Sequence, residues 1–231
     1  MASTPPTEEA FLREVDDELR REQIQSMWKR YGRYMLGAVL LALAAFAAFL
    51  FWRAHSQQQA EKRGEDMSAA IADIQAGRKT EAGQKLDALI ADGGTGYAVT
   101  ALFAKAALAA GKGDSKTAAG IYAGVAADES VAQPFRDVAL IRQTLTEYDS
   151  LKPQQVIDRL KPLTQPDNGF FGTAGELTAM ALLQLNRPAE AGRLLAAVAQ
   201  DKNSPATLRA RAERLATSLG ANVATKPADK D

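Results

Sequence analysis

Hydrophobic and polar residues are distributed along this chain in three different patterns, and the first is one long apolar run. Residues 34–52, YMLGAVLLALAAFAAFLFW, contain no charged side chain and lie between Arg33 and Arg53. A helix of this length spans about 28 Å at 1.5 Å per residue, close to the ~30 Å hydrocarbon core of a bilayer. The run therefore predicts a transmembrane helix with aromatic ends at Tyr34 and Trp52. The alternative is a buried helix of a soluble core, although core helices usually keep a polar face.

The second pattern is amphipathic and precedes the apolar run. Phe11, Leu12, Val15 and Leu19 form a stripe at helical spacing, and charged residues occupy the other faces. We expect residues 1–33 to form an amphipathic cytoplasmic segment. In the first interpretation, this segment lies on lipid headgroups or pairs with its own copy. In the second, it docks on a cytoplasmic or membrane partner. The mixture of acidic and basic residues on the polar face favours the first interpretation.

The third pattern extends over residues 53–219 and is helical throughout. Alanine, leucine and charged residues dominate, and Val, Ile and Thr do not alternate with polar residues as they would in a strand. Breaks rich in Gly, Pro, Asn and Asp divide the region into about nine helices. The polar residues 220–231 are expected to form a disordered tail. The sequence thus predicts an all-α protein in which one transmembrane helix precedes a helical domain.

An internal repeat organises that helical domain. The segments 80–92, 116–128 and 189–201 align without gaps, and residues 153–163 follow the same register. Their equivalent positions are separated by 36, 38 and 35 residues. Such a period with two helices per unit indicates a solenoid of helical hairpins. We expect four hairpins and a closing helix over 205–219.

These repeats resemble the tetratricopeptide family. A small or short side chain begins the second helix of each unit, and a large apolar residue follows four positions later. The first set is Ala82, Ala118, Val156 and Ala191, and the second set is Leu86, Tyr122, Leu160 and Leu195. Small residues let paired helices cross closely, and large residues fill the space between hairpins. Two features depart from the family pattern. The aromatic residues of the first helix are absent, and Pro162 stands late in the second helix of the third unit.

The order of segments resembles one family more specifically. An amphipathic helix, the stretch REQIQSMWKRYGRYMLGAVLL at 21–41 and a tetratricopeptide-like domain are similar to the YfgM family of ancillary SecYEG translocon subunits. This resemblance implies a single-pass protein of the inner membrane with its repeats in the periplasm. It also implies association with translocon subunits and with the membrane-anchored chaperone PpiD.

The basic residues beside the apolar run indicate its orientation. Five Lys and Arg residues lie within the twenty positions before it, and three lie within the twenty positions after it. This difference places the N-terminus in the cytoplasm by the positive-inside rule. The domain after Arg53 is then expected outside the cytoplasm.

Composition excludes several classes of function. Residues 53–219 carry 20 basic and 19 acidic residues, which is not the footprint of a nucleic-acid-binding domain. The chain has no cysteine and a single histidine, His55, so neither a metal site nor a thiol nucleophile is expected. The Gly111-Lys112-Gly113 sequence lacks the Ser or Thr of a phosphate-binding loop. We therefore expect no catalysis and no cofactor.

Binding remains as the expected function. The family's groove positions correspond to an apolar set, which either forms a partner groove or packs as core: Phe103, Ile141, Leu145, Tyr148 and Met180. Ala38, Ala42 and Ala45 form a small-residue face that could pack against another transmembrane helix, for example in a homo-oligomer. Our main hypothesis is a non-catalytic, membrane-anchored interaction module that assists export or periplasmic folding. The alternative is a self-assembling scaffold of the envelope or the division machinery.

Overall fold

The computed structural model describes the backbone of residues 6–92, 95–165 and 167–221 and the side chains of residues 30–92, 96–165 and 167–221. In these ranges the chain is helical and contains no strand, which confirms the predicted all-α class. The helices are α1 (Pro6–Gln75), α2 (Lys79–Asp92), α3 (Thr95–Ala110), α4 (Ser115–Ala127), α5 (Gln133–Glu147), α6 (Pro153–Leu160), α7 (Phe171–Gln184), α8 (Pro188–Gln200) and α9 (Ala206–Ser218). Two compact units are present, Met1–Glu61 and Lys62–Asp231.

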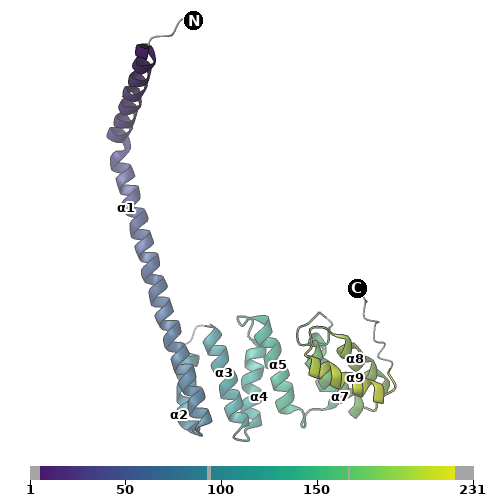
Figure 1. The fold of residues 1–231 in the computed structure, drawn as a ribbon. Helices are drawn as coiled ribbons and strands as arrows, with labels where there is room; N and C mark the ends of the chain where they lie inside the picture. Colours follow the sequence, from purple (N-terminus) through teal and green to yellow (C-terminus); the bar gives the residue numbers. More distant parts are fainter. Residues whose placement is uncertain (1–5, 93–94, 166, 222–231) are drawn as a thin grey trace, which may run out of the picture. The chain divides into compact units, whose positions relative to one another are not determined.

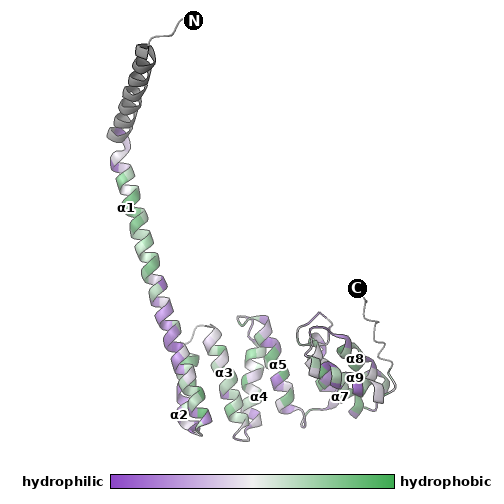
Figure 2. Ribbon diagram, viewed as in Figure 1, coloured by the Kyte–Doolittle hydropathy of each residue, from purple (hydrophilic) through white to green (hydrophobic). Residues whose placement is uncertain are grey.

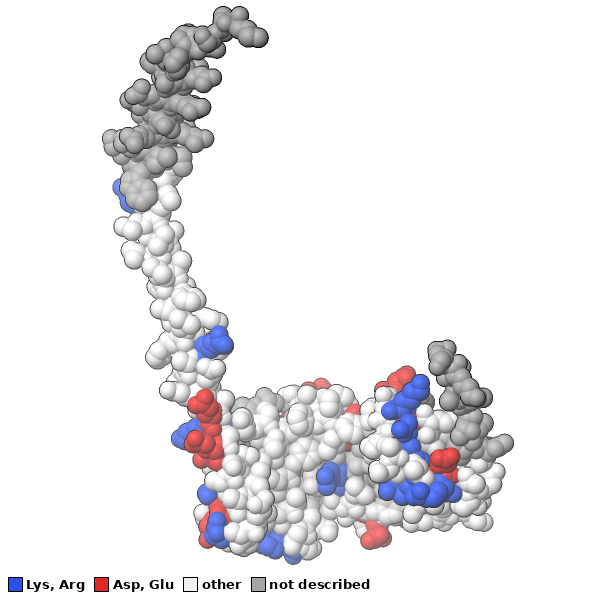
Figure 3. All heavy atoms as spheres, in the orientation of Figure 1, with Lys and Arg blue, Asp and Glu red and all other residues white. Residues whose placement is uncertain are grey.

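The first unit contains the apolar run. Every side chain from residue 34 to residue 52 is exposed, and none of the apolar stretch is buried against the rest of the chain. Figure 2 shows this part of α1 as its most hydrophobic stretch, and Figure 3 shows its surface free of acidic and basic side chains. Among the described residues this is the one helix long and apolar enough to cross a membrane. The structure therefore does not support the alternative in which residues 34–52 form a buried helix of a soluble core.

Two sequence predictions concern residues at or beyond the edge of the described part. The amphipathic stripe of Phe11, Leu12, Val15 and Leu19 lies outside the residues whose side chains the structure describes, and the predicted tail from residue 222 onward lies outside the described residues. The small-residue face Ala38, Ala42 and Ala45 is described, and all three alanines are exposed.

The second unit is a series of antiparallel helical hairpins. Residues 62–75 of α1 pair with α2, α3 with α4, α5 with α6 and α7 with α8, while α9 packs on α7 and α8. Consecutive helices from α2 to α5 lie side by side (Figure 1). This arrangement corresponds to the four hairpins and the closing helix expected from the repeat period.

The interior of these hairpins is built from the repeat positions. All eight residues of the two signature sets are buried, with at most 5% of any of them exposed. Leu86 packs with Met67, Ala70 and Leu89, and Leu195 packs with the buried apolar residues of α7 and α9. Because the first residue of each pair is short, the second helix of the hairpin can approach the first closely.

The turns inside three of the hairpins share one backbone conformation. Gly77, Gly113 and Asn186 each have a positive φ and each stand two positions before the second helix begins. A residue in this left-handed region ends a helix by satisfying its last carbonyl groups, and glycine and asparagine adopt it at low cost. The third hairpin has no positive φ at the equivalent Leu151 and uses Pro153 at the start of α6 instead.

The third hairpin also has a shorter second helix than the sequence predicts. The repeat register continues to residue 163, but α6 ends at Leu160 and a 3₁₀ turn follows over Lys161–Leu163. Pro162 explains the difference, because it has no N–H to donate and its ring crowds the preceding turn. Leu163 nevertheless stays buried in the core beside Val156 and Leu160.

A buried carboxylate fixes the first hairpin turn. Asp73 of α1 accepts hydrogen bonds from Arg78 Nε at 2.8 Å and Arg78 Nη2 at 2.6 Å, and its other oxygen accepts from Lys85 Nζ at 2.7 Å. The hydrogen bond from Lys85, followed by that from Arg78, lowers the pKa of Asp73. These contacts connect the end of α1, the turn and α2.

This network predicts a loss of stability in acid. Because the folded-state pKa of Asp73 is depressed, its contribution is complete above the ordinary aspartate pKa of ~4 and is lost as pH falls through the lower folded-state value. We expect Asp73→Asn to lower the melting temperature at pH 7 and to flatten its decline between about pH 5 and pH 2. Circular dichroism melts of the unit starting at Lys62 measure both effects.

The matched control is Asp66→Asn, since Asp66 is also on α1 but is exposed and makes no hydrogen bond within the described residues. This variant should keep the wild-type pH profile. Parallel profiles for Asp73→Asn and the wild type would contradict a stabilising role for the buried carboxylate.

Candidate functional site

The main candidate site is an apolar pocket on the first helices of three successive hairpins. Its volume is about 460 Å³, within the ~300–1,000 Å³ typical of ligand pockets. It lies between α1, α3 and α5, with one residue from α4. The lining residues are Met67, Ile71, Thr100, Phe103, Ala104, Ala107, Tyr122, Phe135, Val138 and Arg142.

Three aromatic rings, those of Phe103, Tyr122 and Phe135, and several aliphatic side chains give this pocket its apolar character. The ring centroids of Phe103 and Tyr122 are 5.7 Å apart with the rings tilted by 47°. Tyr122 is buried, whereas Ile71 and Phe135 remain 42% and 41% exposed. The pocket thus has a packed aromatic base and leaves large apolar side chains in contact with solvent, as is common where a protein partner binds.

Arg142 is the one charged residue that lines the pocket. Its side chain is exposed, and within the described residues it makes no hydrogen bond and no ion pair. No carboxylate lines the pocket.

Tyr122 also lines the pocket, and its hydroxyl is a potential hydrogen-bond donor there. Burial raises the pKa of Tyr122, and the positive charge of Arg142 acts on it in the opposite direction. The hydroxyl therefore stays protonated at neutral pH and can donate a hydrogen bond.

The five predicted groove residues do not form one surface. Phe103 lines the pocket, and Leu145 is 46% exposed on the same helix as Phe135 and Arg142. Met180 is exposed on α7 and is not part of the pocket lining. Ile141 is only 6% exposed and packs with Val156 and Leu160, so it belongs to the core.

Tyr148 is the fifth predicted groove residue and also packs against the core. It contacts the cluster of Ile141, Val156 and Leu160, and its hydroxyl is buried with no hydrogen-bond partner in the described residues. Burial is the main cause of its raised pKa, and the neighbouring Asp149 raises it further. Of the two interpretations that the sequence allowed, core packing therefore fits Ile141 and Tyr148, and exposure fits Leu145 and Met180.

Sequence reasoning missed Phe135 and Arg142. The predicted break between helices extends over residues 128–134, whereas α5 already begins at Gln133 with Pro134 in its first turn. Proline is favoured in the first turn of a helix, so this signal was available. With that start, Phe135, Val138, Arg142 and Leu145 recur at spacings of three, four and three and share one helix face.

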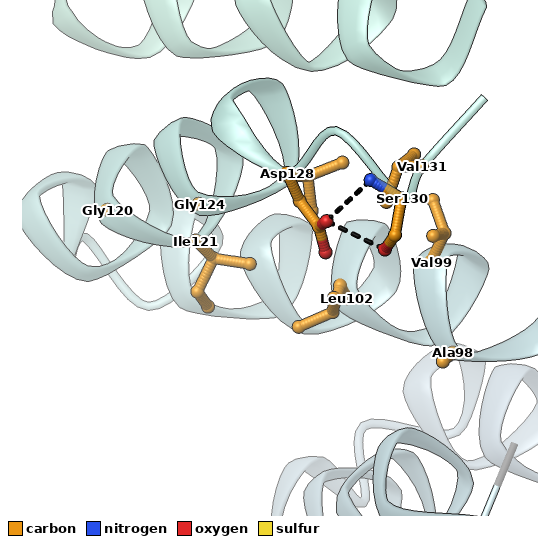
Figure 4. A pocket seen from close by; sticks show the side chains of 10 residues that line it. Ala98, Val99, Leu102, Gly120, Ile121, Gly124, Asp128, Ser130 and Val131 are labelled. Atoms are coloured by element: carbon orange, nitrogen blue, oxygen red, sulfur yellow. Dashed lines mark hydrogen bonds between the residues drawn. The ribbon is translucent and has the colours of Figure 1, made fainter. Parts of the chain in front are cut away.

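Two further cavities lie in the same unit. One of about 380 Å³ is lined by apolar and small residues of α3 and α4 and by the turn after α4 (Figure 4). Its carboxylate, Asp128, accepts hydrogen bonds from the Ser130 N–H at 2.9 Å and the Ser130 hydroxyl at 2.7 Å, as Figure 4 shows, and so serves the turn. The other is lined mostly by polar and charged residues, and two of them, Lys105 and Asp87, form an ion pair at 2.5 Å. Within the described residues no group of three His, Cys, Asp or Glu could hold a metal ion.

The repeat domain is a helical-repeat solenoid. Its hairpins follow one another in series, short side chains lie at the helix crossings, and an apolar pocket lies on the first helices. The family model described as a tetratricopeptide repeat-like domain matches residues 25–218, and the chain therefore belongs to this family. The predicted tetratricopeptide-like character is thus confirmed, and domains of this kind are typically non-catalytic modules that bind other proteins. The match includes the apolar segment 34–52. Comparisons with curated proteins and with solved structures found no match.

Proposed function

We propose that this protein is a single-pass membrane protein whose repeat domain binds other proteins during their export. The apolar segment 34–52 carries the proposal, because its side chains are exposed over a length that suits a bilayer. Leaving so many large apolar side chains in water would be strongly unfavourable at about 25 cal/mol per Å². Burial in lipid removes that cost.

The proposed orientation has the N-terminus in the cytoplasm and the repeat domain in the periplasm. The excess of Lys and Arg before the segment supports it, since basic residues near a span are retained in the cytoplasm. Arg30 and Arg33 lie over the rings of Tyr31 and Tyr34, at 5.8 and 4.9 Å from the ring centroids. Such paired basic and aromatic side chains suit the headgroup region.

The proposed partners are subunits of the Sec translocon and a membrane-anchored chaperone such as PpiD. The resemblance of residues 21–41 and of the segment order to the YfgM family supports this choice. The apolar pocket supports a role in binding protein segments, because exposed apolar concavities of this size are suited to large side chains.

Site-directed crosslinking in intact inner membranes tests the proposal. A photoreactive benzoylphenylalanine replaces Ile71, which lines the pocket and is exposed. We expect adducts with a translocon subunit, with PpiD or with a protein in transit. The same residue in place of Lys116, which is exposed on α4 outside the apolar pocket, is the control and should give few adducts.

Two outcomes would contradict the proposal. Protection of the repeat domain from protease added to spheroplasts would reverse the orientation. Adducts with further copies of this chain alone, together with stable homo-oligomers in detergent, would favour the self-assembling scaffold.

A further inference from the structure

The apolar pocket contains one feature that general apolar binding does not require. A pocket that only captured hydrophobic side chains would be best lined by uncharged residues, since a cation loses hydration when an apolar group covers it. Here Arg142 lines the pocket together with Phe103, Val138 and Phe135.

The position of Arg142 within its helix face makes the cation part of the binding surface. Phe135 and Val138 precede it on that face of α5, and Leu145 follows it. Phe135 and Leu145 are 41% and 46% exposed, so apolar surface continues on both sides of the arginine. A segment bound along α5 would therefore meet apolar side chains, then the guanidinium, and then an apolar side chain again.

The acidic residues described near Arg142 do not pair with it, so its guanidinium is available to bind a carboxylate of a partner. The nearby acidic residues on α5 have other partners: Asp137 is buried and accepts from Gln133 at 2.7 Å, and Glu147 pairs with Arg159 at 2.5 Å. No carboxylate from α1, α3 or α4 lines the pocket. The Tyr122 hydroxyl offers a second donor in the same lining, and it makes no hydrogen bond within the described residues.

We propose that this pocket selects protein segments in which a large apolar or aromatic side chain lies next to an aspartate or glutamate. The inference rests on the proposed function, in which the domain binds proteins, and adds the chemistry of the bound segment. The apolar side chain fills the space around Phe103, and the adjacent carboxylate accepts hydrogen bonds from the Arg142 guanidinium, which matches carboxylate geometry in a bidentate manner.

A pocket with a single arginine favours an acidic protein segment over nucleic acid or an anionic membrane. Binding to nucleic acid or to an anionic membrane surface needs several clustered cations, and the lining supplies one. A segment in which lysine follows the apolar residue would place like charges together, which disfavours binding.

Peptide binding to the full-length protein in nanodiscs of neutral phosphatidylcholine tests this selection. The probes are fluorescein-labelled peptides of glycine and serine that carry three Phe-Asp, Phe-Asn, Phe-Lys or Ala-Asp pairs. Fluorescence anisotropy should rank Phe-Asp about 1.5- to fivefold above Phe-Asn, the range expected for an exposed ion pair. Phe-Lys should bind more weakly still, and Ala-Asp should not bind measurably.

Two arginine variants locate the effect. Arg142→Gln should remove the preference for Phe-Asp over Phe-Asn. Arg193→Gln removes the same charge from an exposed position on α8, outside the pocket, and should keep the preference. Circular dichroism melts check that both variants are folded.

The outcomes separate this inference from the proposed function. Equal binding of Phe-Asp and Phe-Asn, retention of the preference in Arg142→Gln, or no binding of any peptide would overturn the selection of acidic segments. The proposed function is decided independently, by the crosslinks and the protease sensitivity of the protein in its own membrane.

Discussion

Leu195→Ala is expected to lower the free energy of unfolding of the repeat domain by about 2–5 kcal/mol. Leu195 is 1% exposed and packs in a cluster with Phe171, Leu182, Val198 and Leu208. Truncation removes its transfer free energy and leaves a cavity that α7 and α9 cannot fill without shifting. Urea unfolding of the soluble unit that starts at Lys62 measures the loss.

Leu145→Ala is the matched control for that experiment. It makes the same chemical change in a helix, but the Leu145 side chain is 46% exposed. We expect a change within about 0.5 kcal/mol, as for most surface substitutions. If Leu195→Ala were as mild as this control, the repeat register would not describe the core. If Leu145→Ala were as costly as Leu195→Ala, Leu145 would be a core residue.

The core could be predicted because it follows the repeat. Each hairpin must place a short residue at the helix crossing and a large apolar residue one turn later, so both recur at the spacing of the repeat. Ala82 and Leu86 in the first unit and Ala191 and Leu195 in the last were found in this way, and all four are buried. The apolar segment was equally accessible to sequence reasoning, because nineteen consecutive uncharged residues are visible without any knowledge of packing.

The exposed face could not be predicted to the same precision. Ile141 and Leu145 are four residues apart and so lie on nearly the same helix face. One is 6% exposed and the other 46%, because residues of α6 and α7 pack against Ile141. How far neighbouring helices cover a face depends on their lengths and crossing angles, which Pro162 changes locally by ending α6 early.

The composition of the pocket depended on contacts between distant residues. Arg142 lines the same pocket as Phe103 and Met67 only because α1, α3 and α5 are brought together by successive hairpins. Its spacing on α5 was visible in the sequence, but its lack of an acidic partner required the positions of Asp137 and Glu147 and their own partners. Charge complementarity toward a partner is therefore a property of the folded domain.

Gly175→Ala is expected to lower the free energy of unfolding by about 1–3 kcal/mol, even though alanine is the better helix former. A Cβ atom at this position of α7 would lie 2.6 Å from Val198 Cγ2 of α8, closer than real contacts allow. The valine cannot easily turn away, because a β-branched side chain in a helix has one strongly preferred rotamer. The two helices of the fourth hairpin must then separate or distort.

Gly120→Ala is the same chemical change, but it is expected to raise the free energy of unfolding instead of lowering it. Gly120 is exposed on α4, and a Cβ there would meet no atom within 4 Å. The gain in helix propensity should raise the free energy of unfolding by about 0.5–1 kcal/mol. Urea unfolding of both variants in the unit starting at Lys62 measures the difference. Stabilisation by both substitutions would mean that α7 and α8 tolerate a wider separation, and the close helix crossing would not be what makes glycine necessary at position 175.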